Sequence, residues 1–229
     1  MYKGIDISAY QTNIDWANVN VDFCIMRASI GLSKDSMVDS HVKGCIGQNI
    51  PYGFYHYLKA TTASDAIKEA NLFLSVIKDY RPTYPVIVDV EDKTLNGLSK
   101  TALTDIVIAF MQVLEDNNYY AMIYTNNDWY INKLDNTRLK KYDLWLAWWR
   151  TLKPKTNYNF GMWQRGLGTV KGFNAKIDVD TAYKDYPSII TKYGLNKSNE
   201  LTKNEQIEAL NKKVEELQTK INNAIKALE

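Results

Sequence analysis

The stretch Pro85-Val-Ile-Val-Asp89-Val-Glu91-Asp92 leads a run of branched apolar residues directly into acidic ones. Branched residues favour β-strands, and residues two apart in a strand point to the same side. Asp89 and Glu91 are therefore expected to face the same space, about 6.6 Å apart along the chain. Two carboxyls at this range can act across a glycosidic bond, and their repulsion raises the pKa of one of them. Taken alone, the stretch also fits a strand that runs out into a solvated turn.

Eight segments rich in β-branched and aromatic residues are predicted to be strands. They are Lys3–Ser8, Asp22–Ala28, Tyr52–Tyr57, Val86–Val90, Tyr120–Tyr124, Leu144–Trp148, Phe160–Gln164 and Lys176–Val179. The helix-like intervals are Asp15–Val19, Asp35–Asn49, Ser64–Asp79, Lys100–Asn117 and Asn127–Leu139, with Ser64 as the clearest helix start. The gaps at 150–159 and 165–175 are too short for a crossover helix.

The order of these segments predicts the fold class. Alternating strands and helices favour a largely parallel sheet, and eight strands with polar C-terminal ends suggest closure into a barrel. The last three strands, joined by short loops, need not all be parallel. An open doubly wound sheet is the alternative, but no Gly-rich phosphate loop follows any strand.

Two further acidic residues lie in predicted strands. Asp6 and Asp178 each stand between branched apolar residues, where a carboxylate is costly to bury. In a closed barrel the first and last strands are neighbours, so we expect both to converge with Asp89 and Glu91 at one mouth. Such a cluster could also bind a divalent cation. The only histidines, His41 and His56, form no HxH or HExxH pattern, and neither a metal nor a cofactor is expected.

Composition excludes several classes of protein. A net charge of +2 does not suit a nucleic-acid partner. No apolar run approaches the roughly 18 residues of a membrane span, and no signal peptide is visible at the N-terminus. Cys24 and Cys45 are expected to be buried free thiols. The 16 Tyr and 6 Trp residues suit a wet groove that holds sugar rings, although packing accounts for many of them.

Seven motifs in this order resemble the lysozymes of glycoside hydrolase family 25 from Tyr2 to about Tyr183. They are GIDISxxQ (4–11), YGFYHY (52–57), PVIVDVED (85–92), IYTN (123–126), WLAWW (145–149), MWQ (162–164) and IDVD (177–180). The resemblance implies an irregular (βα)5β3 TIM-like barrel. It also implies cleavage of the β-1,4 bond between N-acetylmuramic acid and N-acetylglucosamine in bacterial peptidoglycan.

The resemblance also implies roles for individual residues. Glu91 would be the general acid, and Asp89 would stabilise the positively charged transition state or orient the substrate acetamido group. Asp6 and Asp178 would position substrate and tune this pair. The implied sugar contacts are Tyr57, Tyr124, Trp148 and Gln164. Arg27 departs from the family pattern, which leaves open the subsite formed by the second loop.

Other functions are weighed against this one. A catalytically silent carbohydrate-binding barrel would replace Glu91 or Asp89, and neither is replaced. A coiled-coil scaffold carrying the barrel as cargo would lose all function without the residues after Lys192. The missing signal peptide favours a phage or prophage endolysin, held in the host cytoplasm before release to the cell wall, over a secreted bacterial lysozyme, although a mature secreted chain would look the same.

The composition changes after Gly194 to Lys, Glu, Asn and Gln, with no aromatic residue up to Glu229. Apolar residues then recur at spacings of three and four, at Ile207, Leu210, Val214, Leu217, Ile221, Ala224 and Leu228. This heptad predicts a two-stranded parallel coiled coil, started by the capping box of Thr202 and Glu205. We therefore divide the chain into a barrel (1–193), a linker (194–206) and a helix (207–229) that forms a homodimer. A helix packed on the barrel and a stub before a wall-binding domain are the alternatives.

Overall fold

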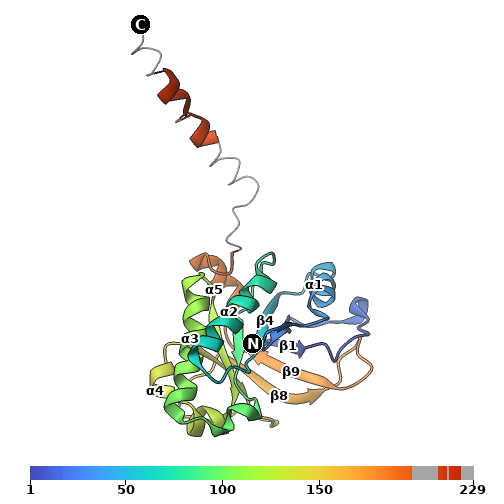
Figure 1. The fold of residues 1–229 in the computed structure, drawn as a ribbon. Coiled ribbons are helices and arrows are strands. Elements are labelled where there is room, and N and C mark those ends of the chain that lie inside the picture. The colour runs from blue at the N-terminus through green and yellow to red at the C-terminus, as the bar shows by residue number, and fades with distance from the viewer. Residues whose placement is uncertain (198–210, 216, 223–229) are drawn as a thin grey trace. The chain divides into compact units, whose positions relative to one another are not determined.

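The computed structural model describes residues 1–197, 211–215 and 217–222. It divides into two compact units, Met1–Lys197 and Ser198–Glu229, and each is described by itself. In the first unit, strands alternate with helices through most of the chain (Figure 1).

The elements of the first unit occur in a regular order along the chain. They are β1 (Tyr2–Ile7), the 3-10 helix η1 (Trp16–Asn18), β2 (Phe23–Ile30), β3 (Ser33–Lys34), α1 (Val38–Gly47), β4 (Tyr52–Tyr57), α2 (Ala63–Ile77), β5 (Val86–Asp89), the 3-10 helix η2 (Lys93–Gly97), α3 (Lys100–Asp116), β6 (Ala121–Asn126), the π-helix η3 (Trp129–Lys133), α4 (Asn136–Leu139), β7 (Asp143–Ala147), β8 (Met162–Gly168), β9 (Ile177–Ala182) and α5 (Tyr186–Tyr193).

The strands form a closed barrel. Their order is β1-β9-β8-β7-β6-β5-β4-β2-β3, and a parallel pairing of β1 with β2 closes the circle. Pairing is parallel from β1 through β2, β4, β5, β6 and β7 to β8, whereas β9 is antiparallel to both β8 and β1. The predicted barrel is therefore confirmed, with its last strand reversed, and the open sheet is wrong.

All eight predicted strands are present; Tyr52–Tyr57 has the predicted bounds and the other seven have shifted ends. The largest shift is at β8, which begins at Met162 and ends at Gly168. In the described residues, the intervals 150–159 and 165–175 contain no helix, as the short gaps predicted. The short strand β3, the helix η2 and the helix α5 were not predicted.

The predicted helix starts need correction. Helix α2 begins at Ala63, because the Thr62 side chain accepts a hydrogen bond from the Asp65 backbone N–H at 3.2 Å. Thr62 has the extended backbone of an N-cap, and Ser64 lies inside the first turn. The interval Asn127–Leu139 is not one helix, since Asp135 caps a separate α4 after η3. The interval Asp15–Val19 forms only the single turn η1.

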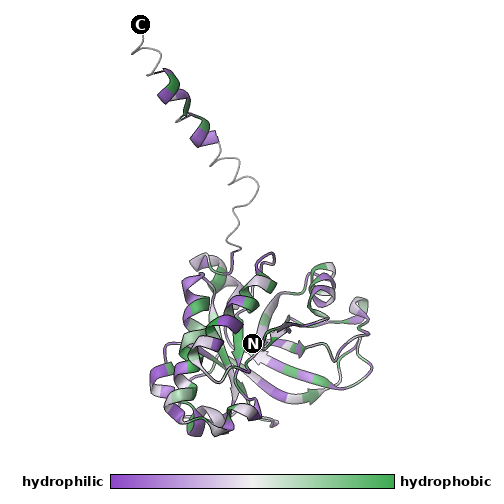
Figure 2. Ribbon diagram, viewed as in Figure 1, coloured by the Kyte–Doolittle hydropathy of each residue, from purple (hydrophilic) through white to green (hydrophobic). Residues whose placement is uncertain are grey.

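Apolar residues fill both the barrel and the layer between barrel and helices. In the outer layer Phe73 of α2 packs against Phe110 of α3, with ring centroids 6.1 Å apart. Inside the barrel Phe23 stacks on Tyr84 at 4.5 Å. A Cβ on Gly4 would lie 2.4 Å from the Phe23 ring, so only glycine fits there. Figure 2 shows hydrophobic and hydrophilic residues alternating along β8 and β9, as strands with two different faces require.

The two cysteines are buried and free, as predicted. Cys24 lies in β2 and Cys45 in α1. Burial raises the pKa of the Cys24 thiol well above its usual value. These thiols belong to the packed layer between barrel and helix.

The first unit extends beyond position 193, to Lys197. The buried Asn196 side chain donates to the carbonyls of Pro82 and Tyr84 at 3.0 and 2.9 Å, and it accepts from the Tyr120 backbone at 2.8 Å. The segment after α5 is thus tied to the ends of two strands. Asn196 therefore belongs to the barrel unit.

In the second unit, residues 211–215 and 217–222 are helical. Val214, Leu217 and Ile221 are 60%, 51% and 53% exposed there. The other heptad positions and the expected capping box lie outside the described residues. The heptad coiled coil stays a prediction.

Candidate active site

A cavity of about 700 Å³ opens at the C-terminal ends of the parallel barrel strands. This is the end at which barrels of this kind carry their catalytic groups. The cavity contains every site residue that the sequence predicted: Asp6, Tyr57, Asp89, Glu91, Tyr124, Trp148, Gln164 and Asp178. The structure therefore brings all eight predicted residues together in one cavity.

Asp6 and Asp178 come together through strand register. The antiparallel pairing of β1 with β9 sets these two residues directly opposite each other, so their side chains share one face. Asp180, two residues further along β9, points to the same face but is fully buried, opposite Gly4. Its Oδ1 accepts a 2.8 Å hydrogen bond from the indole of Trp145. A third acidic residue thus lies beneath the first two, and no role for it was predicted from the sequence.

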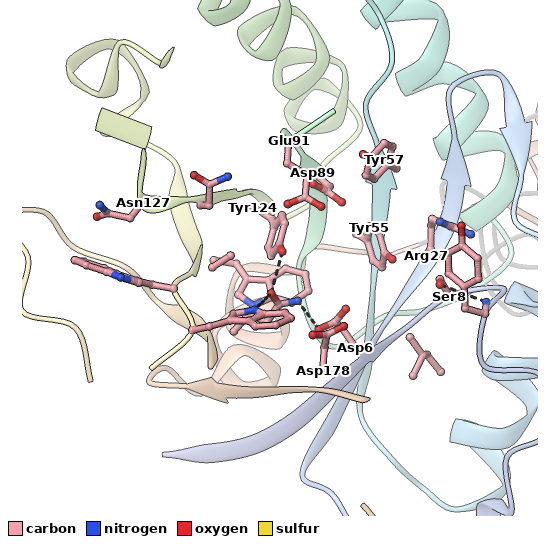
Figure 3. A pocket seen from close by; sticks show the side chains of 18 of the residues that line it. Asp6, Ser8, Arg27, Tyr55, Tyr57, Asp89, Glu91, Tyr124, Asn127 and Asp178 are labelled. Atoms are coloured by element: carbon pink, nitrogen blue, oxygen red, sulfur yellow. Dashed lines mark hydrogen bonds between the residues drawn. The ribbon is translucent and has the colours of Figure 1, made fainter. Parts of the chain in front are cut away.

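Asp89 and Glu91 lie at the C-terminal end of β5 and just beyond it. Asp89 is the last residue of that strand and is buried, whereas Glu91 lies two residues further on and is half-buried. Among the described residues, Asp89 Oδ1 has no hydrogen-bond partner. Figure 3 shows Asp89 and Glu91 on one wall of the cavity and Asp6 with Asp178 on another. One oxygen of Asp89 is thus buried and, within the described part of the chain, unpaired.

The third acidic residue of the stretch, Asp92, plays a different part. Its side chain accepts from the Thr94 backbone N–H at 2.8 Å, capping η2, and from Lys59 Nζ at 2.8 Å. Burial works against ionisation, but the hydrogen bonds from Lys59 and Thr94 outweigh it and lower the pKa of Asp92. Asp92 therefore stays ionised and holds the loop after β5.

Burial raises the pKa of every carboxyl in the cluster, and at Asp6, Asp89 and Glu91 neighbouring negative charges add to the effect. Burial and the charge of Asp178 raise the pKa of Asp6 to about 7. Burial and the charge of Glu91 raise the pKa of Asp89 well above its usual value. Burial and the charge of Asp178 raise the pKa of Glu91. The sequence led us to expect one raised pKa in the Asp89–Glu91 pair, and in the structure both rise.

Aromatic side chains form the walls of the cavity. Tyr55 and Tyr57 come from β4, Tyr124 from β6, and Trp145 from β7, where it lies 4.5 Å from the Tyr124 ring. Tyr55 and Trp145 were not predicted as site residues. The two-residue alternation that places Tyr57 in the cavity also applies to Tyr55, so strand period was the signal that could have found it.

Arg27 occupies one side of the cavity, where the sequence departs from the family pattern. Its Nε donates to Asp35 at 2.7 Å, and its guanidinium lies 5.5 Å from the centre of the Tyr10 ring. Asp35 also accepts from the Ala9 backbone at 3.1 Å. Arg27 thereby joins β2 to the loop after β1, and its charge opposes the rise in the pKa of Asp89.

His56 lies outside the cavity. One ring nitrogen is 2.8 Å from Ser29 Oγ and the other is 2.8 Å from Glu69 Oε2, and the ring stacks on Phe110 at 5.0 Å. Burial lowers the pKa of His56. Its place in the packed layer makes it a structural residue.

Across residues 1–197 and the described helix residues, no group of three or more His, Cys, Asp or Glu side chains is arranged to hold a metal ion. Within the same residues, no helix combines the length and apolarity that crossing a membrane requires.

Comparison with known proteins gives consistent matches. The family model for glycosyl hydrolases family 25 matches residues 5–166. The autolytic lysozyme of Clostridium acetobutylicum is 30% identical over 183 residues, which are 78% of this chain and 55% of that protein. The N,O-diacetylmuramidase of Arthroderma benhamiae is 28% identical over 152 residues, 59% of this chain and 62% of that protein. The chain thus spans a little over half of the length of these relatives.

Solved structures match over the barrel. The CTP1L endolysin has a TM-score of 0.74 at 26% identity, covering 84% of this chain and 70% of the other. The modular autolysin LytC of Streptococcus pneumoniae, solved with a synthetic peptidoglycan ligand, has a TM-score of 0.71 at 25% identity. That match covers 80% of this chain and 46% of LytC.

Proposed function

The chain belongs to glycosyl hydrolases family 25, and from this premise we propose that it is a muramidase acting on bacterial peptidoglycan. It hydrolyses the β-1,4 bond between N-acetylmuramic acid and N-acetylglucosamine. The observation that carries the proposal is the cluster of carboxyls from β1, β5 and β9 in one aromatic-walled cavity. The lysozyme and muramidase among the relatives, and the peptidoglycan ligand named for LytC, support this substrate.

Glu91 is the general acid in this proposal. Its raised pKa keeps the carboxyl protonated at a pH where an ordinary glutamate is ionised. It protonates the oxygen of the leaving sugar as the glycosidic bond breaks. Asp89, with one oxygen free of partners in the described structure, accepts from the acetamido N–H and faces the positive charge that develops at the anomeric carbon.

The remaining predicted residues hold the substrate in place. Asp6 and Asp178 bind sugar hydroxyls on the wall opposite Glu91 and tune its charge. The rings of Tyr57, Tyr124 and Trp148 pack against the sugars. Gln164 acts as a positioning residue, because its amide nitrogen already donates to Asp6 at 2.9 Å and its oxygen accepts from Tyr124 at 3.0 Å.

Reductive mass spectrometry of digested peptidoglycan tests this function. The wild-type chain should release fragments with new muramic-acid reducing ends, and Glu91→Gln should not. Asp105→Asn is a matched control, since this exposed acid pairs with Arg138 on the surface. Cut peptides or glucosamine reducing ends would contradict the assignment. Intact glycan with the wild-type chain would favour a silent carbohydrate-binding barrel.

We propose that residues 207–229 form a homodimer, joined by residues 198–206 to the barrel unit, which extends to Lys197 rather than ending at the expected position 193. The exposed stripe of Val214, Leu217 and Ile221 in the described helix residues supports this, because an apolar stripe at heptad spacing gains stability when a second helix covers it. Light scattering after size-exclusion chromatography should give a dimer for the full chain and a monomer for residues 1–197. A monomeric full chain at high concentration would exclude the dimer.

We also propose that the chain acts as an endolysin, present in the host cytoplasm before it reaches the cell wall. The endolysin among its structural relatives supports this setting. Fractionation of producing cells before lysis should find the chain inside them. Its accumulation in the medium of intact cells would contradict this setting.

A further inference from the structure

A second cavity, of about 520 Å³, lies at the opposite end of β6 and β7 from the catalytic cluster. Tyr120, which precedes β6, and Asp143, which begins β7, line it, whereas Asn126 and Ala147 at the far ends of these strands line the first cavity. The six residue-to-residue steps from Tyr120 to Asn126 span about 20 Å in a strand. The two cavities share no lining residue. The second cavity therefore has its own lining, which meets that of the first where the Tyr158 hydroxyl donates to Asn127.

The lining of this cavity is polar and aromatic, with no aliphatic side chain. It includes four tyrosines, among them Tyr130 and Tyr158, whose rings lie 4.6 Å apart. Tyrosine offers an apolar face together with a hydroxyl, which suits a ligand that has both C–H faces and polar groups. An apolar ligand would find no matching surface, and a sugar or polyol would.

The charge of the lining is positive, opposite in sign to that of the catalytic cluster. Lys184 pairs with Asp143 at 2.8 Å, and Lys141 pairs with Glu115 at 2.7 Å. Asp143 also accepts from the Tyr186 hydroxyl at 2.8 Å, so its charge is already engaged. Lys140 lines the cavity with no ionic partner among the described residues. An anionic group of a ligand could therefore pair with Lys140.

Asparagine side chains supply further polar groups. Asn136, Asn157 and Asn159 line the cavity, and within the described structure their amides make no hydrogen bond to the protein. Each amide carries donors and an acceptor that can meet hydroxyl groups. The cavity thus presents a free ammonium group, free amides and aromatic faces in one place.

We propose that this cavity binds an anionic glycan segment, a sugar or polyol chain that carries phosphate or carboxylate groups. The anion pairs with Lys140, the hydroxyls bond to the asparagine amides, and the carbon face of the ligand packs on the tyrosines. The proposed function bears on this only in naming the bacterial wall as the source of the glycan. A second contact with the wall would hold the enzyme near its substrate by raising its local concentration.

Sedimentation with purified wall sacculi tests the proposal in full-length chains that carry Glu91→Gln, so that binding is measured without cleavage. The test variant adds Lys140→Gln and Asn159→Ala, both at exposed positions. Lys43→Gln on α1 is the matched control. Tyr158 is left intact, because its hydroxyl donates to Asn127 of the first cavity.

We expect the test variant to bind sacculi about tenfold more weakly than the control at low salt, with an unchanged melting temperature. Hydrofluoric acid removes phosphodiester polymers from sacculi. If the test variant and the control bind treated sacculi equally, the ligand is a phosphate-bearing glycan. If the difference in binding persists, the ligand is a peptidoglycan carboxylate. Equal binding by the two variants, or no binding by either, overturns the proposal. The same surface variants with Glu91 restored should cleave soluble glycan fragments as fast as the wild type. This second assay reports separately on the proposed function.

Discussion

Gln164 Nε2 donates a 2.9 Å hydrogen bond to Asp6 Oδ2, although the two residues are 158 positions apart. The bond joins β8 to β1 across the intervening β9. The Gln164 oxygen accepts from the Tyr124 hydroxyl at 3.0 Å and from the Trp149 indole at 3.2 Å. One amide therefore sets the positions of a carboxyl and two aromatic side chains of the cavity.

Replacing Gln164 with Met should keep the volume of the side chain and remove these hydrogen bonds. Small displacements of groups in a site can cost about 100-fold in rate, and we expect kcat/KM on soluble peptidoglycan fragments to fall by about that factor. The pKa of Asp6 should rise further, because the amide hydrogen bond lowers it. Gln112→Met, on the exposed face of α3, is the control and should be neutral. A Gln164→Met enzyme with unchanged kcat/KM would show that the amide has no positioning role.

The buried acidic cluster should make the fold less stable as pH rises. A carboxyl whose pKa is raised on folding stabilises the fold fully below its unfolded pKa, and this contribution is lost as pH rises through the folded pKa. For Asp6 the window runs from about 4 to about 7. We expect the melting temperature of the wild type to fall by about 5 °C or more across this window.

Asp180→Asn should make this fall smaller. The amide oxygen can still accept from Trp145, while one buried acidic group, whose own pKa burial and the charge of Asp6 raise, is removed. Thermal unfolding of both chains from pH 4 to pH 7.5 measures the effect. Asp105→Asn serves as a surface control. If the melting temperature falls equally with pH in the wild type and in Asp180→Asn, Asp180 does not contribute to the loss of stability.

Asp178→Asn should move the pH dependence of catalysis. A general acid works in its protonated form, so activity declines as pH rises through the pKa of Glu91. Burial and the charge of Asp178 raise that pKa, and removing the charge should shift the declining limb to lower pH. Burial remains, so the limb stays above the ordinary glutamate value of about 4.3. The pH profile of kcat/KM measures the shift.

Asp128→Asn gives a matched control for that profile. Asp128 lines the same cavity, but it is not among the charges that raise the pKa of Glu91. Its replacement should leave the declining limb in place. Equal pH profiles of kcat/KM for Asp178→Asn and wild type would show that Asp178 does not raise the pKa of Glu91.

Asn196 should contribute to the stability of the barrel although it lies after the last helix of that unit. Asn196→Gly tolerates the positive φ of 58° and deletes the three side-chain hydrogen bonds. Leaving buried backbone groups unpaired costs about 1–3 kcal/mol each, and urea unfolding should show a loss of at least that size. A chain cut after Lys197 should match the full chain at low concentration, whereas one cut after Lys192 should be less stable. Equal stability of the two truncated chains would contradict this role.

Local sequence patterns predicted most of the barrel. The Val-Ile-Val run before Asp89 and the apolar residues around Asp6 and Asp178 predicted strands, because alternation and branching act over a few residues. Helix starts were less accurate. The cap of α2 depends on which hydroxyl, that of Thr62 or Ser64, reaches a free N–H, and that choice follows from the backbone path into the helix.

The sequence by itself determined which acidic residues lie near strand ends, and that helices separate most of the eight strands but not the last three. The tertiary structure alone decided that Asp180 lies beneath Asp6, that Gln164 joins β8 to β1, and that Asn196 ties the chain after α5 to the barrel. Strand period is a local property, so it can be read along the chain. Burial, register and the pKa values that follow from them depend on closure of the barrel, which brings together residues more than 150 positions apart.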